Sequence, residues 1–138
     1  MPQLDRPLSN PSGIHPPVGR YHHLARTSAG ELLFLAGQVA VKSDGNIIGK
    51  GNARDQTVQV YHNIGAILQS VGASYDNIVQ LTTYVVGRHS VQPYLDARSE
   101  LFEEIFSDGK YPPNTLLVVD GLLDEGMLVE VTAIAVLP

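Results

Sequence analysis

The segment from Met127 to Leu137 reads MLVEVTAIAVL and decides the fold of the chain. Its β-branched and small apolar residues predict a strand, and its apolar side chains fall on both faces of that strand. A strand with two apolar faces belongs inside a sheet that is covered on both sides. One face would carry Met127, Val129, Val131 and Ala133, and the other would carry Leu128, Ile134 and Val136.

The chain before this strand alternates between strand and helix patterns. Apolar and β-branched runs predict strands over residues 21–26, 31–40, 78–86 and 115–119, with a short return strand at 47–48. Turn sequences lie at Thr27-Ser28-Ala29-Gly30, which would join the first two strands, and at Ser43-Asp44-Gly45-Asn46. Residues 1–18 hold five of the nine prolines and are predicted to form an extended arm of a single domain spanning 1–138.

Two amphipathic helices separate the strands. Asn52 is a suitable cap for the first helix, and Gly72 would end it. A second helix is expected after Ser90; it tolerates Pro93 in its first turn and ends at Ser107-Asp108-Gly109. The expected buried residues are Val58, Tyr61, Ile64, Leu68 and Val71 in the first helix, and Tyr94, Leu101, Phe102 and Ile105 in the second.

This order predicts an α+β domain with a mixed sheet and two helices. Two helices can cover only one face of such a sheet, so the apolar second face of 127–137 needs another cover. The simplest cover is another copy of the same chain, and we therefore expect a homo-oligomer.

Composition excludes several kinds of site. The 138 residues contain no cysteine, which removes disulfides, thiolate metal ligands and a cysteine nucleophile. The net charge of −5 and the scattered basic residues argue against a nucleic-acid partner, because binding to phosphates rewards clustered Lys and Arg.

The sequence shows neither a secretory layout at its start nor an apolar run of membrane-spanning length. We expect an intracellular, cytoplasmic protein that does not bind membranes.

Glu130 is the most informative charged residue. It shares its strand face with Leu128, Ile134 and Val136, where an unpaired carboxylate would be costly to bury. A carboxyl group in such a place is a candidate general acid or base. The equally weighted alternative is a structural carboxylate that accepts hydrogen bonds from loop amides or an arginine.

The segment Pro112-Pro113-Asn114-Thr115 opens a buried strand. Its two prolines restrict the backbone, so Asn114 is presented in a defined orientation with two donors and one acceptor. The alternative, which the residues alone favour, is that Asn114 only begins a strand after a turn. The histidines show no ligand spacing, so no metal site is predicted.

Several segments together resemble the RidA/YjgF family of reactive-intermediate deaminases. They are Gly19-Arg20-Tyr21, Leu35-Ala36-Gly37-Gln38-Val39, and the stretches 56–63, 72–84 and 112–135. The resemblance covers nearly the whole chain from about residue 10. It implies a fold like that of chorismate mutase, a homotrimer with ligand clefts between subunits, and hydrolysis of 2-imino acids without a cofactor.

The resemblance also implies a set of site residues. In the family pattern an arginine at the start of the buried strand binds the substrate carboxylate, and a glutamate on the last strand positions water. Here Glu130 matches that glutamate, Thr115 matches the hydroxyl residue after the arginine, and Tyr21 matches a tyrosine of the cleft. Ala36, before Gly37, replaces the family's serine, and Asn114 replaces the arginine, as in arginine-less branches.

The loss of that arginine leaves three hypotheses open. Losing such a charged contact to a buried carboxylate costs about 2–5 kcal/mol, so the chain is either a deaminase-like enzyme with an altered ligand or a non-catalytic binding module. Arg98 on the second helix is a candidate replacement cation, although arginines on surface helices are usually solvated. Endoribonuclease activity, a label often attached to the family, is the weakest hypothesis because the chain is acidic.

Overall fold

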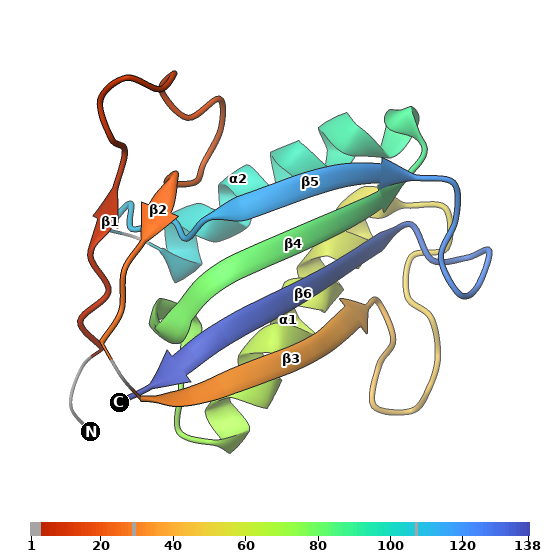
Figure 1. The fold of residues 1–138 in the computed structure, drawn as a ribbon. Coiled ribbons are helices and arrows are strands. Elements are labelled where there is room, and N and C mark those ends of the chain that lie inside the picture. Colours follow the sequence, from red (N-terminus) through yellow and green to blue (C-terminus); the bar gives the residue numbers. More distant parts are fainter. Residues whose placement is uncertain (1–3, 29, 107) are drawn as a thin grey trace.

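The computed structural model describes residues 4–28, 30–106 and 108–138. Its main feature is a four-stranded sheet with the order β3-β6-β4-β5 (Figure 1). The β3–β6 and β6–β4 pairs are antiparallel and the β4–β5 pair is parallel, so the sheet is mixed as expected. The strands are β3 (Glu31–Val39), β4 (Ile78–Val86), β5 (Asn114–Val119) and β6 (Val129–Leu137). The doubly apolar β6 lies between two neighbours, as its sequence requires.

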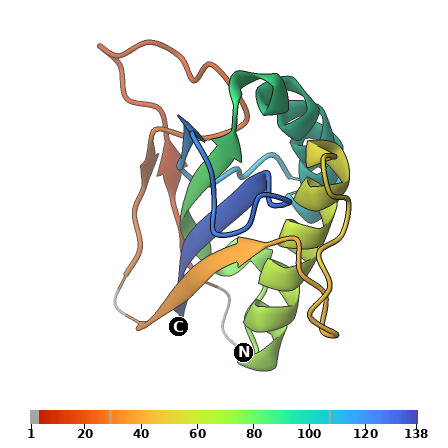
Figure 2. The same cartoon turned by 90° about the vertical axis from the view of Figure 1, so that its right-hand side faces the viewer.

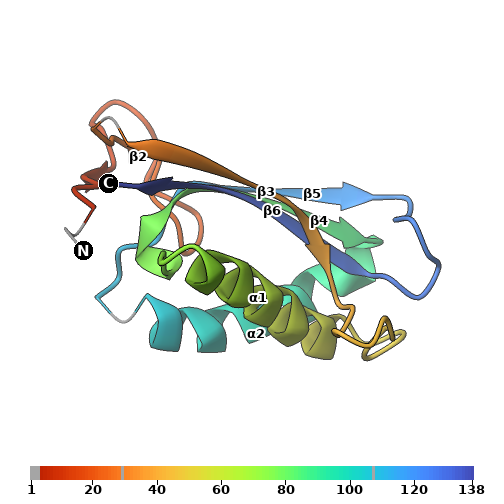
Figure 3. The ribbon, with the colours of Figure 1, turned by 90° about the horizontal axis from the view of Figure 1, so that it is seen from below.

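Two helices, α1 (Ala53–Ser70) and α2 (Val91–Ile105), lie against the same face of the sheet (Figure 3). Short 3₁₀ helices precede β4 (η1, Tyr75–Asn77) and α2 (η2, Arg88–Ser90). The side chain of Asn52 accepts a hydrogen bond from the Asp55 amide and caps α1 as expected. We call the covered side of the sheet the helix face. The fully buried core between the sheet and the helices includes Val60, Ile64, Leu68, Tyr94, Phe102, Val129, Val131 and Ala135.

Two predicted core residues of α1 are exposed instead. Val58 and Val71 are 48% and 47% exposed. The buried stripe runs through Thr57, Tyr61 and Ile64, so Val58 lies one step to the side of it. Val71 is the C-cap residue, beyond the last turn that packs on the sheet.

The N-terminal segments differ most from the prediction. The strand expected over 21–26 shrinks to β2 (Leu24–Ala25), which pairs with β1 (Leu8–Ser9) and not with β3. The amides of Tyr21 and His23 are used by local contacts, to the Gly19 carbonyl and to the Asn10 side chain. The arm is fastened by Arg6, which is 8% exposed and donates to the carbonyls of Ile78 (2.6 Å) and Lys110 (2.9 Å).

Smaller differences concern where elements begin and end. The return strand at 47–48 is reduced to a single bridge between Val41 and Ile47, and β6 starts at Val129 instead of Met127. Parts of the predicted arm, first turn and second helix end, at residues 1–3, 29 and 107, lie outside the described residues.

The second face of the sheet is left largely uncovered, and we call it the open face (Figure 2). Register and burial assign to it Phe34 and Ile134, which are paired, and Leu117, which pairs with Tyr84. Phe34 and Leu117 are 71% and 40% exposed. The apolar character predicted for this face is therefore present, and no helix of the described residues lies over it.

Candidate functional site

A β-bulge in β3 shapes the surroundings of Glu130. The register passes from Leu35 opposite Ala133 to Gln38 opposite Val131, so Ala36 and Gly37 together face Thr132. A Cβ atom at Gly37 would lie 2.6 Å from Oε2 of Glu130 and 2.8 Å from its Cδ. The carboxylate therefore rests directly on the Gly37 backbone, and a side chain at position 37 would displace it. Ala36 is exposed, and its carbonyl accepts a hydrogen bond from the Gln38 side chain (3.1 Å).

Glu130 lies on the open face among hydroxyl groups. It is half-buried and sits opposite Tyr84 on the neighbouring strand. The next row across the sheet is Thr115, Thr82 and Thr132. The arrangement offers a carboxylate that can accept a proton from water, beside side chains that can donate and accept hydrogen bonds. Thr82 and Tyr84 are not among the predicted site residues, although their alternation with the buried Leu81, Thr83 and Val85 was a signal for them.

Asn114 points to the opposite, helix face. Its Oδ1 accepts a hydrogen bond from the Thr83 hydroxyl (3.0 Å), which lies 3.3 Å from the hydroxyl of Tyr94. The Tyr94 hydroxyl in turn lies 3.0 Å from that of Tyr61. Burial raises the pKa of Tyr61 well above its ordinary value, and the positive charge of Arg98 opposes this rise. Nδ2 of Asn114 is buried and has no hydrogen-bond partner among the described residues.

Thr115 follows Asn114 on β5 and therefore faces the other way. Thr115 is exposed and pairs with Thr82 on the open face, whereas Asn114 lies beneath the sheet. Within one chain the predicted residues thus form two groups. Glu130, Gly37 and Thr115 share the open face, and Asn114 is separated from them by the thickness of the sheet.

Arg98 is buried and not solvated. Only 6% of the residue is exposed, and its guanidinium carbon lies 5.8 Å from the ring centre of Tyr94 and 5.7 Å from that of Phe102. Nε of Arg98 is buried without a hydrogen-bond partner in the described part of the chain. A Cβ atom at Gly19 would lie 3.2 Å from a terminal nitrogen of Arg98 and 3.7 Å from the Tyr21 ring. The loop of residues 18–21, which we call the cover loop, therefore lies over this guanidinium.

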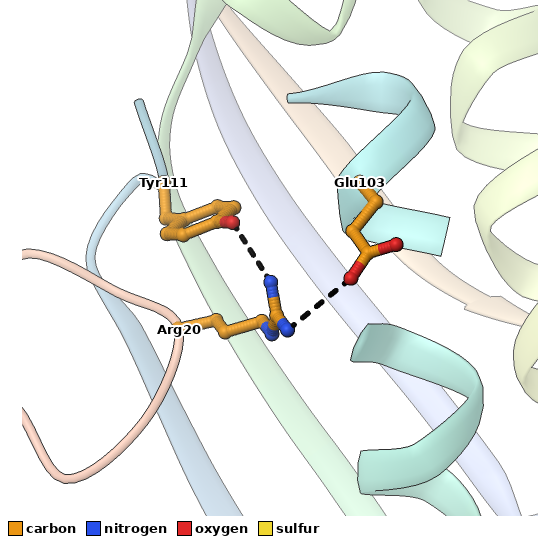
Figure 4. A network of polar contacts seen from close by, with 3 residues as sticks. All are labelled: Arg20, Glu103 and Tyr111. Atoms are coloured by element: carbon orange, nitrogen blue, oxygen red, sulfur yellow. Dashed lines mark hydrogen bonds and ion pairs between the residues drawn. The ribbon is translucent and has the colours of Figure 1, made fainter. Parts of the chain in front are cut away.

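Arg20 holds the cover loop on the outside (Figure 4). It donates to the Tyr111 hydroxyl (2.9 Å) and approaches a carboxylate oxygen of Glu103 on α2 at 3.5 Å. Tyr21 is half-buried, and its hydroxyl accepts a hydrogen bond from the Val18 amide (3.2 Å). Tyr21 thus lies in the loop that covers Arg98 and not beside Glu130 of the same chain. Arg20 is not among the predicted site residues, although it lies in the segment Gly19-Arg20-Tyr21 that resembles the family.

A cavity of about 660 Å³ lies between the arm and the turn before β5. Its charged lining includes Arg6, Asp76, Asp108 and Lys110, and it contains none of the predicted site residues. Within residues 4–28, 30–106 and 108–138, no group of three or more His, Asp or Glu side chains is arranged to hold a metal ion. The described helices include none that is long and apolar enough to cross a membrane.

The mixed sheet with two helices on one face and Glu130 on the inner strand β6 is the α+β arrangement that the sequence predicted. Comparisons with known proteins identify the family to which this fold belongs. The family model described as Endoribonuclease L-PSP matches residues 13–137. A RutC family protein of Pyrococcus horikoshii is 33% identical over 119 residues, covering 86% of this chain and 88% of the relative. The RutC family protein YjgH of Escherichia coli is 27% identical over 135 residues, covering 98% of both chains.

Solved structures show the same fold. The Rid family protein YyfB of Yersinia pestis, of unknown function, superposes with a TM-score of 0.84 at 28% identity, covering 96% of this chain and 99% of that one. TdcF of Escherichia coli, solved with bound serine, gives a TM-score of 0.70 at 24% identity, covering 94% of both chains. The chain belongs to the RidA/YjgF family, as the sequence resemblance indicated.

Proposed function

We propose that the protein binds a small polar metabolite between copies of itself and hydrolyses an imine or enamine C–N bond. The observation that carries this proposal is the position of Glu130 against the Gly37 backbone, with Tyr84 alongside, on an open and largely apolar sheet face. A half-buried carboxylate with a fixed neighbour on one side can orient a water molecule on the other.

The proposed reaction begins when Glu130 takes a proton from water as the water oxygen bonds to the imine carbon. The π electrons of the C=N bond move to nitrogen, which also takes up a proton. The proton on nitrogen is the one that Glu130 took from water, so Glu130 is again a free carboxylate. Glu130 then takes the proton of the new hydroxyl group and passes it to the amino nitrogen; the C=O bond forms as the C–N bond breaks with its electron pair on nitrogen, so that an imine and water yield a carbonyl compound and ammonia. The chain's own groups suffice for these proton transfers, and we propose no cofactor.

The division of the site between two sheet faces supports assembly. Glu130 and Thr115 lie on the open face, whereas Asn114 and Tyr21 lie on the helix side. A ligand that meets both groups needs a second copy of the chain. The exposed apolar residues of the open face, such as Phe34, are a suitable surface for that copy. We propose a homotrimer with Glu130 of one subunit facing the Asn114 side of the next, and we note that the TdcF structure holds a small polar molecule, serine.

The test is ammonia release from freshly generated 2-imino acids. Glu130→Gln should abolish turnover, while light scattering should show the same oligomer as the wild type. Glu125→Gln changes an exposed glutamate that no described contact ties to the site and is the matched control. Turnover by Glu130→Gln at the wild-type rate would contradict the role proposed for Glu130 in activating water. The same pair tests the family description: salt-sensitive RNA cleavage that is lost in Glu130→Gln would favour an endoribonuclease.

A second function is a non-catalytic metabolite-binding or regulatory module. The observation that favours it is the neutral Asn114 at the position where the family pattern has a substrate-binding arginine. Asn114→Arg distinguishes the two functions. Turnover of 2-imino acids by the Asn114→Arg variant alone would favour the binding module, whereas turnover by the wild type favours the enzyme.

A further inference from the structure

The chain enters β5 through residues 110–113, two of which are prolines. A proline has no N–H group, and its ring restricts both its own backbone and that of the residue before it. The Pro113 carbonyl accepts a hydrogen bond from an amide of β4 (2.9 Å), which joins this stretch to the sheet. A change in the direction of the Tyr111 peptide is therefore carried along a stiff connection to Asn114.

The carbonyls at positions 110 and 111 receive hydrogen bonds from the N-terminal segment. His22, which follows the cover loop, is half-buried, and its Nδ1 lies 2.7 Å from the Tyr111 carbonyl oxygen. Arg6 donates to the Lys110 carbonyl (2.9 Å) and also to the carbonyl of Ile78 (2.6 Å), the first residue of β4. The two side chains thus tie the entry of β5 to the N-terminal segment and to the strand with which β5 pairs.

The contact with the carbonyl fixes the tautomer of His22. A carbonyl oxygen only accepts hydrogen bonds, so Nδ1 of the imidazole carries a hydrogen and donates it. In the neutral ring Nε2 then holds a lone pair. The tautomer can be measured, and it distinguishes a donated hydrogen bond from mere proximity of the ring to the carbonyl.

The side chain of Tyr111 has anchors of its own. Its ring stacks on that of Phe102, with centroids 5.7 Å apart and planes at 23°. Its hydroxyl accepts a hydrogen bond from Arg20 at 2.9 Å (Figure 4). Loss of the His22 hydrogen bond should therefore turn the Tyr111 peptide while the ring stays in place.

The space around these contacts allows the peptide to move. The cavity of about 660 Å³ between the arm and the turn before β5 is lined by Arg6, His22 and Lys110, among others. Polar contacts, and not close packing alone, therefore hold the N-terminal segment against the entry of β5. A single substitution that removes one of these hydrogen bonds should have a local and measurable effect.

We propose that His22 is a positioning residue of the ligand site. Its hydrogen bond to the Tyr111 carbonyl sets the direction in which the chain enters β5. It thereby fixes the places of Asn114 and Thr115 on the two faces of the sheet. The proposal rests on the function proposed above, because it names a further residue that shapes the same site. His22 acts through the peptide that it holds and does not touch the ligand.

Two substitutions at His22 separate its hydrogen bond from its bulk. His22→Leu removes the donor and keeps an apolar side chain of similar reach, whereas His22→Asn keeps an N–H group near the place of Nδ1. His62→Leu is the matched control, because it changes an exposed histidine on α1. All three substitutions are made in the whole chain, and urea unfolding reports whether each variant folds.

The first measurement needs no substrate. In ¹⁵N–¹H spectra of the wild type, the neutral ring of His22 should carry its hydrogen on Nδ1. The resonances of the Asn114 side-chain amide and the Thr115 backbone amide should move in His22→Leu. They should return towards their wild-type positions in His22→Asn and stay in place in His62→Leu.

The second measurement is ammonia release from freshly generated 2-imino acids. The kcat/KM of His22→Leu should fall by about 10- to 100-fold, because misplacing a group of the site by about 1 Å costs on the order of 100-fold. His22→Asn should recover most of this loss, and His62→Leu should turn over like the wild type.

The outcomes separate this inference from the proposed function. The inference is overturned by a neutral His22 protonated on Nε2, by unmoved resonances of Asn114 and Thr115 in His22→Leu, or by equal displacement in both His22 variants. Wild-type turnover by His22→Leu also overturns it. Ammonia release that depends on Glu130 would stand in each of these cases. If the wild type releases no ammonia, the catalytic proposal fails and the resonances decide the inference; if His22→Leu does not fold, the tautomer and His22→Asn decide it.

Discussion

Gly37→Ala is the sharpest perturbation of the proposed hydrolytic group. The added Cβ would lie 2.6 Å from Oε2 of Glu130, about 0.8 Å inside the 3.4 Å at which ordinary contact begins. The carboxylate is the far end of a flexible side chain, so it can move away by roughly that distance while the strands stay in place. Misplacement of a catalytic group by about 1 Å costs on the order of 100-fold in rate, or about 2.7 kcal/mol in activation free energy.

We therefore expect Gly37→Ala to lose about 100-fold in kcat for ammonia release while its free energy of unfolding changes by less than about 1 kcal/mol. Urea unfolding and the ¹³C shift of the Glu130 carboxyl carbon complete the assay, and the shift reports displacement whether or not the substrate is known. Gly121→Ala is the matched control, because nothing lies within 4 Å of a Cβ there. An unshifted Glu130 resonance, or wild-type turnover in Gly37→Ala, would refute the reasoning.

Three further predictions concern stability. Gly65→Ala should lower the free energy of unfolding by about 1–3 kcal/mol through overpacking, because its Cβ would collide with the Tyr75 hydroxyl and lie 2.7 Å from Cζ of that ring. Urea titrations should therefore show a loss of stability, whereas replacing glycine by alanine in a helix interior ordinarily raises the free energy of unfolding by about 0.5–1 kcal/mol. Arg6→Met should cost about 1–3 kcal/mol, because the carbonyls of Ile78 and Lys110 lose their donor. Arg88→Met, at an exposed position, should not change the urea midpoint. Tyr61→Phe should reduce the amount by which the free energy of unfolding falls as the pH becomes alkaline, compared with the wild type. Burial raises the folded-state pKa of Tyr61, so its contribution is complete below the unfolded pKa of about 10 and declines as pH rises above it. Urea midpoints between about pH 8 and 11 that fall equally in wild type and variant would contradict the last prediction.

Local patterns were enough to predict the main sheet and both helices. The apolar alternation of residues 127–137 placed β6 inside the sheet, and helical spacing found Tyr61, Ile64 and Leu68. These predictions succeeded because burial in a two-layer fold repeats with the period of the element itself. The strand expected at 21–26 failed for a different reason. Its partner is β1 in the N-terminal arm, and local propensity carries no information on a pairing across more than ten residues.

The sequence contained a signal for the burial of Arg98, but the charge of an arginine favours the opposite prediction. Arg98 lies four residues after Tyr94 and four before Phe102, so helix geometry puts all three on one stripe, and that stripe is buried. Charged residues on helices are usually solvated, which favours the opposite expectation. Only the packing of the cover loop over the end of the stripe shows that the guanidinium is enclosed. That packing depends on Gly19, whose role no local pattern reveals.

The separation of Glu130 from Asn114 follows from strand alternation and leads to a statement about assembly. Asn114 shares its face with Thr83 and the helices, whereas Glu130 and Tyr84 face outward. The face of each residue is fixed by register, because shifting a strand by one residue would also expose the core of β6. A single chain therefore cannot bring both groups to one small molecule. If both act on the same ligand, turnover must fall when the oligomer dissociates, and substitutions at Phe34 on the open face should reduce turnover and assembly together.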